Sequence, residues 1–268
     1  MHRLANFAES FGIQKSRCLV CLAGKARDFA AGAIAEMSAC HKNYLARLAA
    51  IRQETCFPRE SLLAQCREIS WKIDNILRKT TALRIPETPC KFRWATEREA
   101  PGPVVPPGPV VPPGAYFEHP QRPGDRGVVV VPRNLPPEFN SLAALWTLVS
   151  HEARPGHEYR YSEAGGAQMS PLETEGWAVY ALSLIRSHFP PDAWLFSMQI
   201  ALLEAAKCFL EVEFHRGTRN GASVRRYLVE TVGISPEYAE RTFWRMVDTP
   251  GQGLCYFAGY LDCLRVYN

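Results

Sequence analysis

The second half of the chain is a succession of helix-length apolar segments, and this feature constrains the fold most strongly. From Asn140 to the C-terminus, Gly, Pro and Asn residues separate these segments. Residues of these types, which end helices and form turns, are typical of the short connections between consecutive helices. The pattern predicts helices at residues 141–154, 174–189, 192–215, 222–232, 236–247 and 251–267. We therefore expect a mainly α fold with a minor β element.

The first third of the chain has the same helical character. Between Lys25 and Gln53, apolar residues recur at three- and four-residue spacings, which place them on one face of a single long helix. A second helix is expected from about Pro58, whose fixed φ suits a first helical turn, to about Leu83. The two helices would form a hairpin or a small bundle.

The middle of the chain differs in character from both ends. Residues 101–114 read PGPVVPPGPVVPPG, and this density of proline favours an extended linker or exposed arm. A role as a ligand for SH3-type domains is less favoured, because the repeat lacks flanking basic anchors. Residues 127–132 then predict a short strand with one edge unpaired. We expect an N-terminal helical region (1–95), a Pro-rich arm (96–126) and a C-terminal metal-binding catalytic region (127–268).

Composition excludes several classes of protein. Hydrophobic residues make up 47% of the chain, and the net charge of +4 comes from scattered residues without a block of one sign. A globular protein is expected, and neither nucleic acid nor a membrane is an expected partner. The chain has nine cysteines, which is an odd number, and they are not closely spaced as they are in small disulfide-rich proteins. The apolar run at residues 18–24 is too short for an export or anchoring segment, so we expect a cytoplasmic protein.

The residues that carry chemistry cluster around two histidines. His151 and His157 are followed, eighteen residues after the second, by Glu175. Two imidazoles and one carboxylate are a common ligand set for catalytic zinc, and they leave a fourth position for water. Glu152, next to the first histidine, could take a proton from that water as a general base. Zn²⁺ is the expected cofactor, although His2Glu sites also accept other divalent metals.

The spacing of the two histidines demands a break in the helix. They lie six residues apart, so an unbroken helix would point them about 120° away from each other. Pro155 and Gly156 lie between them, and this pair permits a bulge or a break. The metal-site hypothesis therefore depends on a distorted backbone before His157.

Three motifs in order resemble the signatures of a bacterial family. They are HExxPGH at 151–157, EGWAxY at 175–180, and PGQxxxYxxG at 250–259 followed by Leu264 and Arg265. Together they are similar to the domain-of-unknown-function 885 family, over a range from about Tyr116 to the C-terminus. That family is regarded as a relative of the thimet-oligopeptidase-like gluzincin metallopeptidases. The resemblance implies a helical metallopeptidase fold with a small edge sheet near the metal.

The resemblance also implies roles for individual residues. His151, His157 and Glu175 would be the zinc ligands, and Glu152 the base. The strand that contains Val129 and Val130 would be an edge strand along which an extended substrate lies. Two residues, His215 and Tyr256, would lie near the site and stabilise an oxyanion, and Arg265 would hold a substrate carboxylate. Each of these last three also has a purely structural alternative: a helix C-terminal cation, a core aromatic residue and a solvated arginine, respectively.

The chain departs from the family in two respects. Members are commonly about twice as long, which implies here either an open cleft or a homodimer in which a second subunit closes it. The segment at 211–215 also lacks the family's usual residues before the histidine. The leading hypothesis is a zinc-dependent hydrolase of peptides or small amides. The alternatives are a metal-dependent biosynthetic lyase, cyclase or transferase acting on a small amino-acid-like molecule, and a non-catalytic interaction module.

Overall fold

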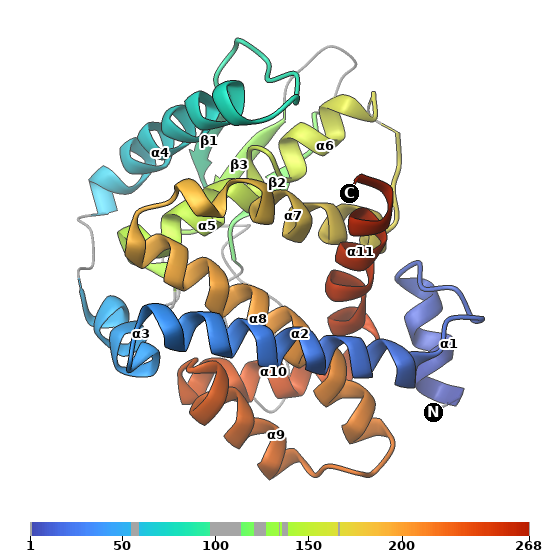
Figure 1. Ribbon diagram of the computed structural model, residues 1–268. Helices are drawn as coiled ribbons and strands as arrows, with labels where there is room; N and C mark the ends of the chain where they lie inside the picture. Colours follow the sequence, from blue (N-terminus) through green and yellow to red (C-terminus); the bar gives the residue numbers. More distant parts are fainter. Residues whose placement is uncertain are drawn as a thin grey trace. The chain divides into compact units, whose positions relative to one another are not determined.

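The computed structural model is mainly helical and contains a small three-stranded mixed sheet (Figure 1). It describes residues 2–54, 59–96, 114–120, 127–133, 135, 139–165 and 167–267. The chain divides into two compact units, each built from separate segments. Unit 1 contains residues 1–50, 168–180 and 195–268, and unit 2 contains residues 51–167 and 181–194.

Within the described residues of unit 1, every regular secondary-structure element is a helix. Its full helices are α1 (His2–Ser10), α2 (Leu19–Cys40), α9 (Gly221–Tyr227), α10 (Pro236–Asp248) and α11 (Gln252–Tyr267), with a π-helical turn, η3 (Leu228–Val232). It also holds most of α3 (Tyr44–Gln53), α7 (Pro171–Ile185) and α8 (Pro191–His215). Small residues at positions 26, 30 and 33 of α2 are buried. The Phe29 ring of the same helix contacts the Phe257 ring of α11 edge-on, at a centroid distance of 5.4 Å.

Unit 2 combines helices with the sheet. It contains α4 (Arg59–Thr80), α5 (Leu142–Glu152), α6 (His157–Glu163) and a short 3-10 helix, η2 (Arg186–His188). Helix α4 packs against both α5 and strand β1 (Figure 1). Its apolar side chains recur at helical spacing and are buried: Leu62, Cys66, Ile69, Ile73 and Leu77. This amphipathic pattern is what fixes α4 against the rest of the unit.

The sheet has the order β1-β3-β2, with β1 (Lys91–Trp94) parallel and β2 (Tyr116–Glu118) antiparallel to β3 (Val128–Val131). The valine run is therefore the central strand, and the prediction that it has a free edge is wrong. Val129 pairs with Phe92 on one side and Phe117 on the other. Because both sides of Val129 and Val130 are paired and both residues are almost fully buried, they cannot pair with a substrate as an edge strand would. The edges of the sheet are β1 and β2.

Most helices expected from the sequence are confirmed within two or three residues, including the one that begins near Pro58. The single helix expected at 25–53 is instead two helices, α2 and α3. The Asn43 side chain accepts a hydrogen bond from the amide of Ala46 at 3.0 Å, so it caps α3 and ends the continuity of the helix. The Pro-rich repeat lies outside the described residues apart from Gly114. The three-part division of the chain stays a prediction.

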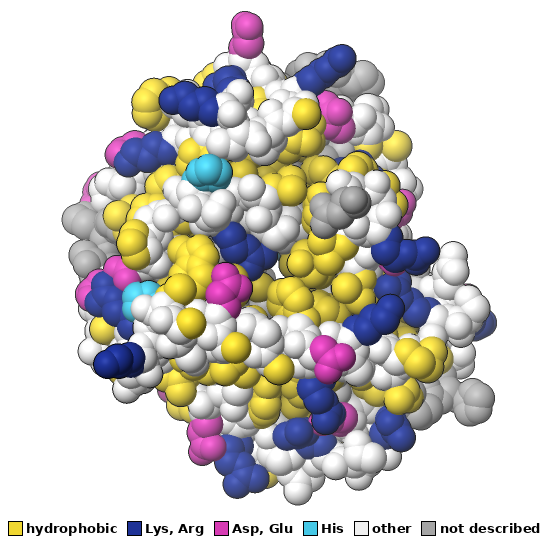
Figure 2. All heavy atoms as spheres, viewed as in Figure 1, with side chains coloured by type: hydrophobic (Ala, Val, Ile, Leu, Met, Phe, Trp, Pro, Cys, Tyr) yellow, Lys and Arg dark blue, Asp and Glu magenta, His cyan; other side chains and the backbone are white. Residues whose placement is uncertain are grey.

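Surface and composition features agree with a globular chain. On the face drawn in Figure 2, the described basic and acidic side chains are interspersed, with hydrophobic side chains between them. Among the described residues, one helix, α8, is long and apolar enough to cross a membrane, with a mean hydropathy of 1.4 over its most apolar stretch. That stretch is 83% buried inside the protein.

Candidate metal centre

The two histidines of the motif lie on either side of a sharp break between α5 and α6. Ser141 caps the start of α5 by accepting a hydrogen bond from the amide of Ala144 at 3.2 Å. The helix ends at Glu152, and Ala153 leaves the helical conformation with φ −99° and ψ −105°. The peptide bond before Pro155 is cis, and α6 begins at His157. The break that Pro155 and Gly156 predicted is therefore present.

Gly156 allows the backbone to turn back against α5. A Cβ atom at this position would lie 1.8 Å from the carbonyl oxygen of His151, which is far inside van der Waals contact. Only glycine permits so close an approach. As a result, the chain returns to the last turn of α5, and His157 comes to lie beside His151.

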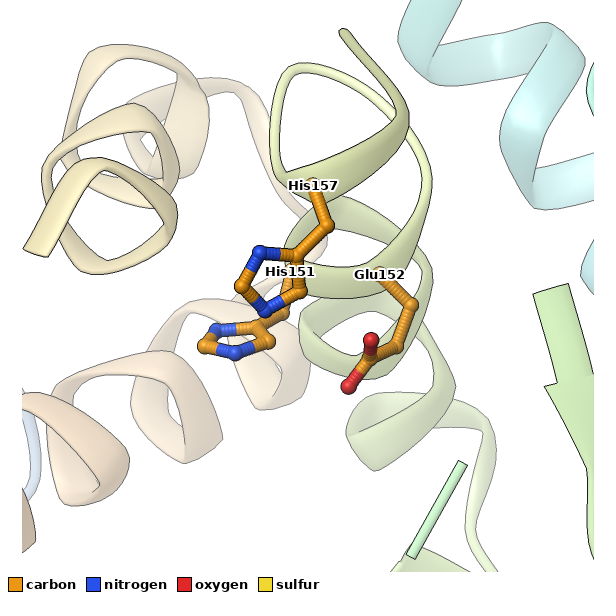
Figure 3. A group of neighbouring side chains, drawn as sticks. All are labelled: His151, Glu152 and His157. Atoms are coloured by element: carbon orange, nitrogen blue, oxygen red, sulfur yellow. The ribbon is translucent and has the colours of Figure 1, made fainter. Parts of the chain in front are cut away.

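His151, Glu152 and His157 form one compact group. The two imidazole rings lie 4.7 Å apart between centroids and are nearly perpendicular. One potential ligand atom from each of the three half-buried side chains lies within 4.8 Å of the others, and the carboxylate lies beside the two rings (Figure 3). Ligand atoms about 2.1 Å from one ion are at most about 4.2 Å apart, so small side-chain rotations suffice. The group could hold a metal ion.

Arg154 holds the loop between the two histidines in place. Its side chain is fully buried and pairs with Glu158 at 2.8 Å and with Asp74 of α4 at 2.9 Å. It also donates hydrogen bonds to the carbonyl oxygens of Pro86 at 3.1 Å and Thr88 at 2.7 Å. These partners tie the break between α5 and α6 to α4 and to the segment after it. Arg154 is therefore a positioning residue for both histidines.

An aromatic pair lies next to the second histidine. Tyr161 follows His157 by one helical turn, so both side chains occupy the same face of α6. The ring of His119, which follows β2, lies 4.5 Å from the Tyr161 ring. Burial lowers the pKa of His119, and the nearby His157 lowers it further. The sequence alone does not indicate His119, because this residue lies 32 residues before the motif, and no periodic pattern links positions at that distance.

Glu175 belongs to unit 1, where it lies on α7 near Tyr256 of α11. Two glycines from the sequence motifs allow these helices to touch. A Cβ atom on Gly176 would lie 2.3 Å from the Cα atom of Gly259, and one on Gly259 would lie 2.0 Å from the carbonyl oxygen of Leu172. Burial raises the pKa of Tyr256 well above its usual value, and the charge of Glu175 adds to the shift. The assignment of Glu175 as the third ligand stays a prediction.

The remaining predicted residues also lie in unit 1. His215 is the last residue of α8, and its Nε2 atom lies 3.0 Å from the carbonyl oxygen of Met246 on α10. Arg265 is exposed in the last turn of α11. The structure thus brings together His151, Glu152 and His157 in one unit, and Glu175 and Tyr256 in the other. The roles predicted for His215, Tyr256 and Arg265 remain predictions.

Glu211 has a structural role that the sequence did not reveal. It is fully buried on α8 and accepts a hydrogen bond from the backbone amide of Gly251, just before α11. Burial raises the pKa of Glu211 to about 8, although the bonds from the amides of Gly251 and Gly253 oppose the shift. The carboxyl group therefore fixes the glycine turn from which Tyr256 follows. The helix at 192–215 also contains Glu204 and Glu213, so the sequence offered no signal that distinguishes Glu211 from them.

Comparisons with known proteins agree with the motifs. A structure described as a putative lipoprotein from Colwellia psychrerythraea is 18% identical, with a TM-score of 0.78 over 98% of this chain and 48% of that chain. A putative lipoprotein of unknown function from Shewanella oneidensis is 17% identical, with a TM-score of 0.75 over 97% of this chain and 51% of that one. At these identities the likeness shows the fold alone, and this chain spans about half the length of each structure.

No curated protein matches the chain. The model of one protein family does match it, from residue 22 to residue 266, which is nearly its whole length. That family is described as a bacterial protein of unknown function. Because its model covers almost all of the sequence, including the three motifs, the chain belongs to the DUF885 family.

Proposed function

We propose that the protein is a metal-dependent hydrolase of peptide or small amide bonds. The main observation behind this proposal is the break between α5 and α6. It brings two imidazoles and a carboxylate together, so that one ligand atom from each lies within 4.8 Å of the others. An open set of nitrogen and oxygen ligands with a carboxylate beside it is the arrangement that metal-assisted hydrolysis requires. Zinc is the metal that this donor set suits best, and other divalent metals fit it as well.

Each residue of the proposed centre has a defined task. A bound metal would polarise the carbonyl group of the substrate and lower the pKa of water. His151 and His157 would hold the ion, and the assignment of Glu175 as the third ligand stays a prediction from the sequence. Glu152 accepts the proton of the attacking water and transfers it to the leaving group.

The position of Glu152 supports its role as a base. It follows His151 directly on α5, so its side chain leaves the helix about 100° around the axis from that of the histidine. Its carboxylate consequently lies to the side of the two rings (Figure 3). A carboxylate beside the two imidazoles would be placed to accept a proton from a water molecule held there.

The substitution Glu152→Gln tests this mechanism. The amide keeps the size of the side chain but cannot accept the proton, so turnover of a peptide library should fall by at least about 100-fold. Metal content should stay unchanged. Glu163→Gln, at the exposed end of α6, is the matched control and should keep full activity. Wild-type turnover in Glu152→Gln would refute the assignment of the base.

Product analysis separates hydrolysis from the biosynthetic alternatives. Mass spectrometry of the products should show a gain of one water across the cleaved bond. An isomer or an elimination product would instead support a lyase or cyclase on the same metal. The third alternative, an interaction module, requires neither a metal nor Glu152, so normal cellular function in the Glu152→Gln variant would favour it.

The expected location of the protein stays a prediction. The eight cysteines within the described residues are free, which is consistent with the reduced thiols expected of a cytoplasmic protein. Both structures reported above are described as putative lipoproteins, which is a property of those proteins.

A further inference from the structure

Two cysteines at the start of α2 form a pair separated by two residues. Cys18 is the N-cap residue of the helix, and its Sγ atom accepts a hydrogen bond from the backbone amide of Cys21 at 3.3 Å. This capping bond directs the Cys18 side chain towards the first turn of the helix, from which Cys21 projects. Both side chains are exposed. The two thiols therefore lie close together and are open to solvent.

The segment that carries the pair is anchored within unit 1. Arg17, directly before Cys18, forms an ion pair with Asp262 of α11 at 2.7 Å. It also donates a hydrogen bond to the carbonyl oxygen of Ala258 on the same helix, at 3.2 Å. One turn into α2, Leu22 is buried in the core. The start of the helix is thus held from both sides, so the two sulfur atoms keep their relative position.

The surroundings make the two thiols unequal. The Cys21 thiol donates a hydrogen bond to the Cys18 sulfur atom, which lowers the pKa of Cys18 and raises that of Cys21. The amide of Cys21 lowers the pKa of Cys18 further. The first turn of α2 contains no acidic residue, so the positive end of the helix dipole also favours a thiolate there. Cys18 is therefore the thiol of the pair that ionises first, and the thiolate is the form that reacts with disulfides.

Four other cysteines lie in a different environment. Cys66, Cys90, Cys208 and Cys255 are buried. Burial raises the pKa of each of these thiols, to about 12 for Cys66 and Cys90. Such thiols are almost fully protonated at neutral pH and are out of reach of a reagent in solution. The exposed pair on α2 is accordingly a site of selective thiol chemistry.

We propose that Cys18 and Cys21 form a reversible redox pair, which a low-molecular-weight disulfide such as oxidised glutathione converts into an intramolecular disulfide. The Cys18 thiolate attacks one sulfur atom of the small disulfide, forms a mixed disulfide with it and releases one thiol. Cys21 then loses its proton and attacks the Cys18 sulfur atom, which releases the second thiol. Two protein thiols are oxidised and one small disulfide is reduced to two thiols. The pair belongs to unit 1, and its chemistry does not depend on the proposed hydrolase.

One tryptic peptide reports the state of the pair. Cleavage after Arg17 and Lys25 gives residues 18–25, which contain both cysteines and no other. The full-length protein is equilibrated without oxygen in mixtures of reduced and oxidised glutathione, quenched with acid and alkylated, and the mass of this peptide is measured. Oxidising mixtures should give a peptide without alkyl groups that has lost two hydrogen atoms, and excess reduced glutathione should restore the doubly alkylated form. Two alkylated thiols in every mixture would overturn the proposal.

Single substitutions separate the roles of the two thiols. In Cys21→Ser no second thiol can resolve the mixed disulfide on Cys18, so the peptide should carry one glutathione. In Cys18→Ser the serine can still cap α2. Cys21 should then form its mixed disulfide at least about threefold more slowly than Cys18 does in Cys21→Ser, because less of it is ionised. Equal rates in the two variants would contradict the assignment of Cys18 as the attacking thiol.

Cys40→Ser is the matched control, because Cys40 is also exposed and lies at the opposite end of α2. This variant should form the disulfide between Cys18 and Cys21 at the same glutathione ratio as the wild type. Thermal unfolding of each variant checks its fold. A cross-linked peptide that joins Cys18 or Cys21 to Cys40 in the wild type, in place of the disulfide within residues 18–25, would overturn the pairing.

Discussion

Arg154 demonstrates how a side chain outside the ligand set can determine the geometry of a site. It is buried between Asp74 and Glu158, and its hydrogen bonds reach the carbonyl oxygens of Pro86 and Thr88. Burial raises the pKa of Asp74, and Arg154 opposes that shift. Removing the guanidinium would leave two buried carboxylates without their cation.

Replacing Arg154 should therefore destabilise the protein in a pH-dependent way. Arg154→Met should lower the free energy of unfolding by about 3–5 kcal/mol at pH 7, the usual cost of an uncompensated buried charge. Burial already raises the folded-state pKa of Asp74 above its unfolded value, and loss of the opposing guanidinium raises it further. Stability is then retained at low pH and lost as the pH rises, so the loss should be smaller at pH 5.

Urea unfolding at the two pH values measures this effect. Arg84→Met, an exposed arginine of the same unit, is the control and should change stability by less than about 0.5 kcal/mol. A loss in Arg154→Met that is equal at both pH values would contradict the account of the buried charges.

Gly176 and Gly259 act at the scale of the element, because they let α7 and α11 cross in direct backbone contact. Gly176 belongs to the motif at 175–180 and Gly259 to the motif at 250–259. The single crossing of the two helices therefore explains a glycine in each motif. It brings Glu175 and Tyr256 into the same neighbourhood. The two glycines are thus required by packing, independently of any chemistry.

A methyl group at this crossing should push the helices apart. In Gly259→Ala the new Cβ atom would meet a backbone oxygen at 2.0 Å, so we expect a loss of stability of about 2–3 kcal/mol or more. Gly24→Ala on α2 is the matched control, because no atom lies within 4 Å of its Cβ position. The control should be neutral or stabilise by up to about 1 kcal/mol. Equal effects of both substitutions on the melting temperature would argue against the crossing.

The elements differ in how well the sequence predicted them. Long helices followed from apolar periodicity, and the break before His157 followed from the proline and glycine beside it. The central position of β3 did not follow, because its partner β1 is a four-residue strand with no strong pattern of its own. Strand pairing is a long-range property, and a valine run alone does not distinguish a central strand from an edge strand.

At the scale of the whole molecule, neither unit corresponds to one continuous stretch of sequence. Local motifs could therefore predict the histidine pair, whose members are six residues apart. They could not predict the contact between Arg154 and Asp74, which lie 80 residues apart, or the hydrogen bond from the amide of Gly251 to Glu211, which lie 40 residues apart. Side chains that a motif leaves unexplained become interpretable only once the fold has placed them.

The most direct test of the account is the metal content of the purified full-length chain, measured by elemental analysis after reconstitution with zinc. The wild type should hold about one ion per chain, and the double variant His151→Ala, His157→Ala should hold almost none. His188→Ala, an exposed histidine on η2, should bind as the wild type does. A chain that binds no metal, or a double variant that binds as much as the wild type, would contradict the proposed metal centre.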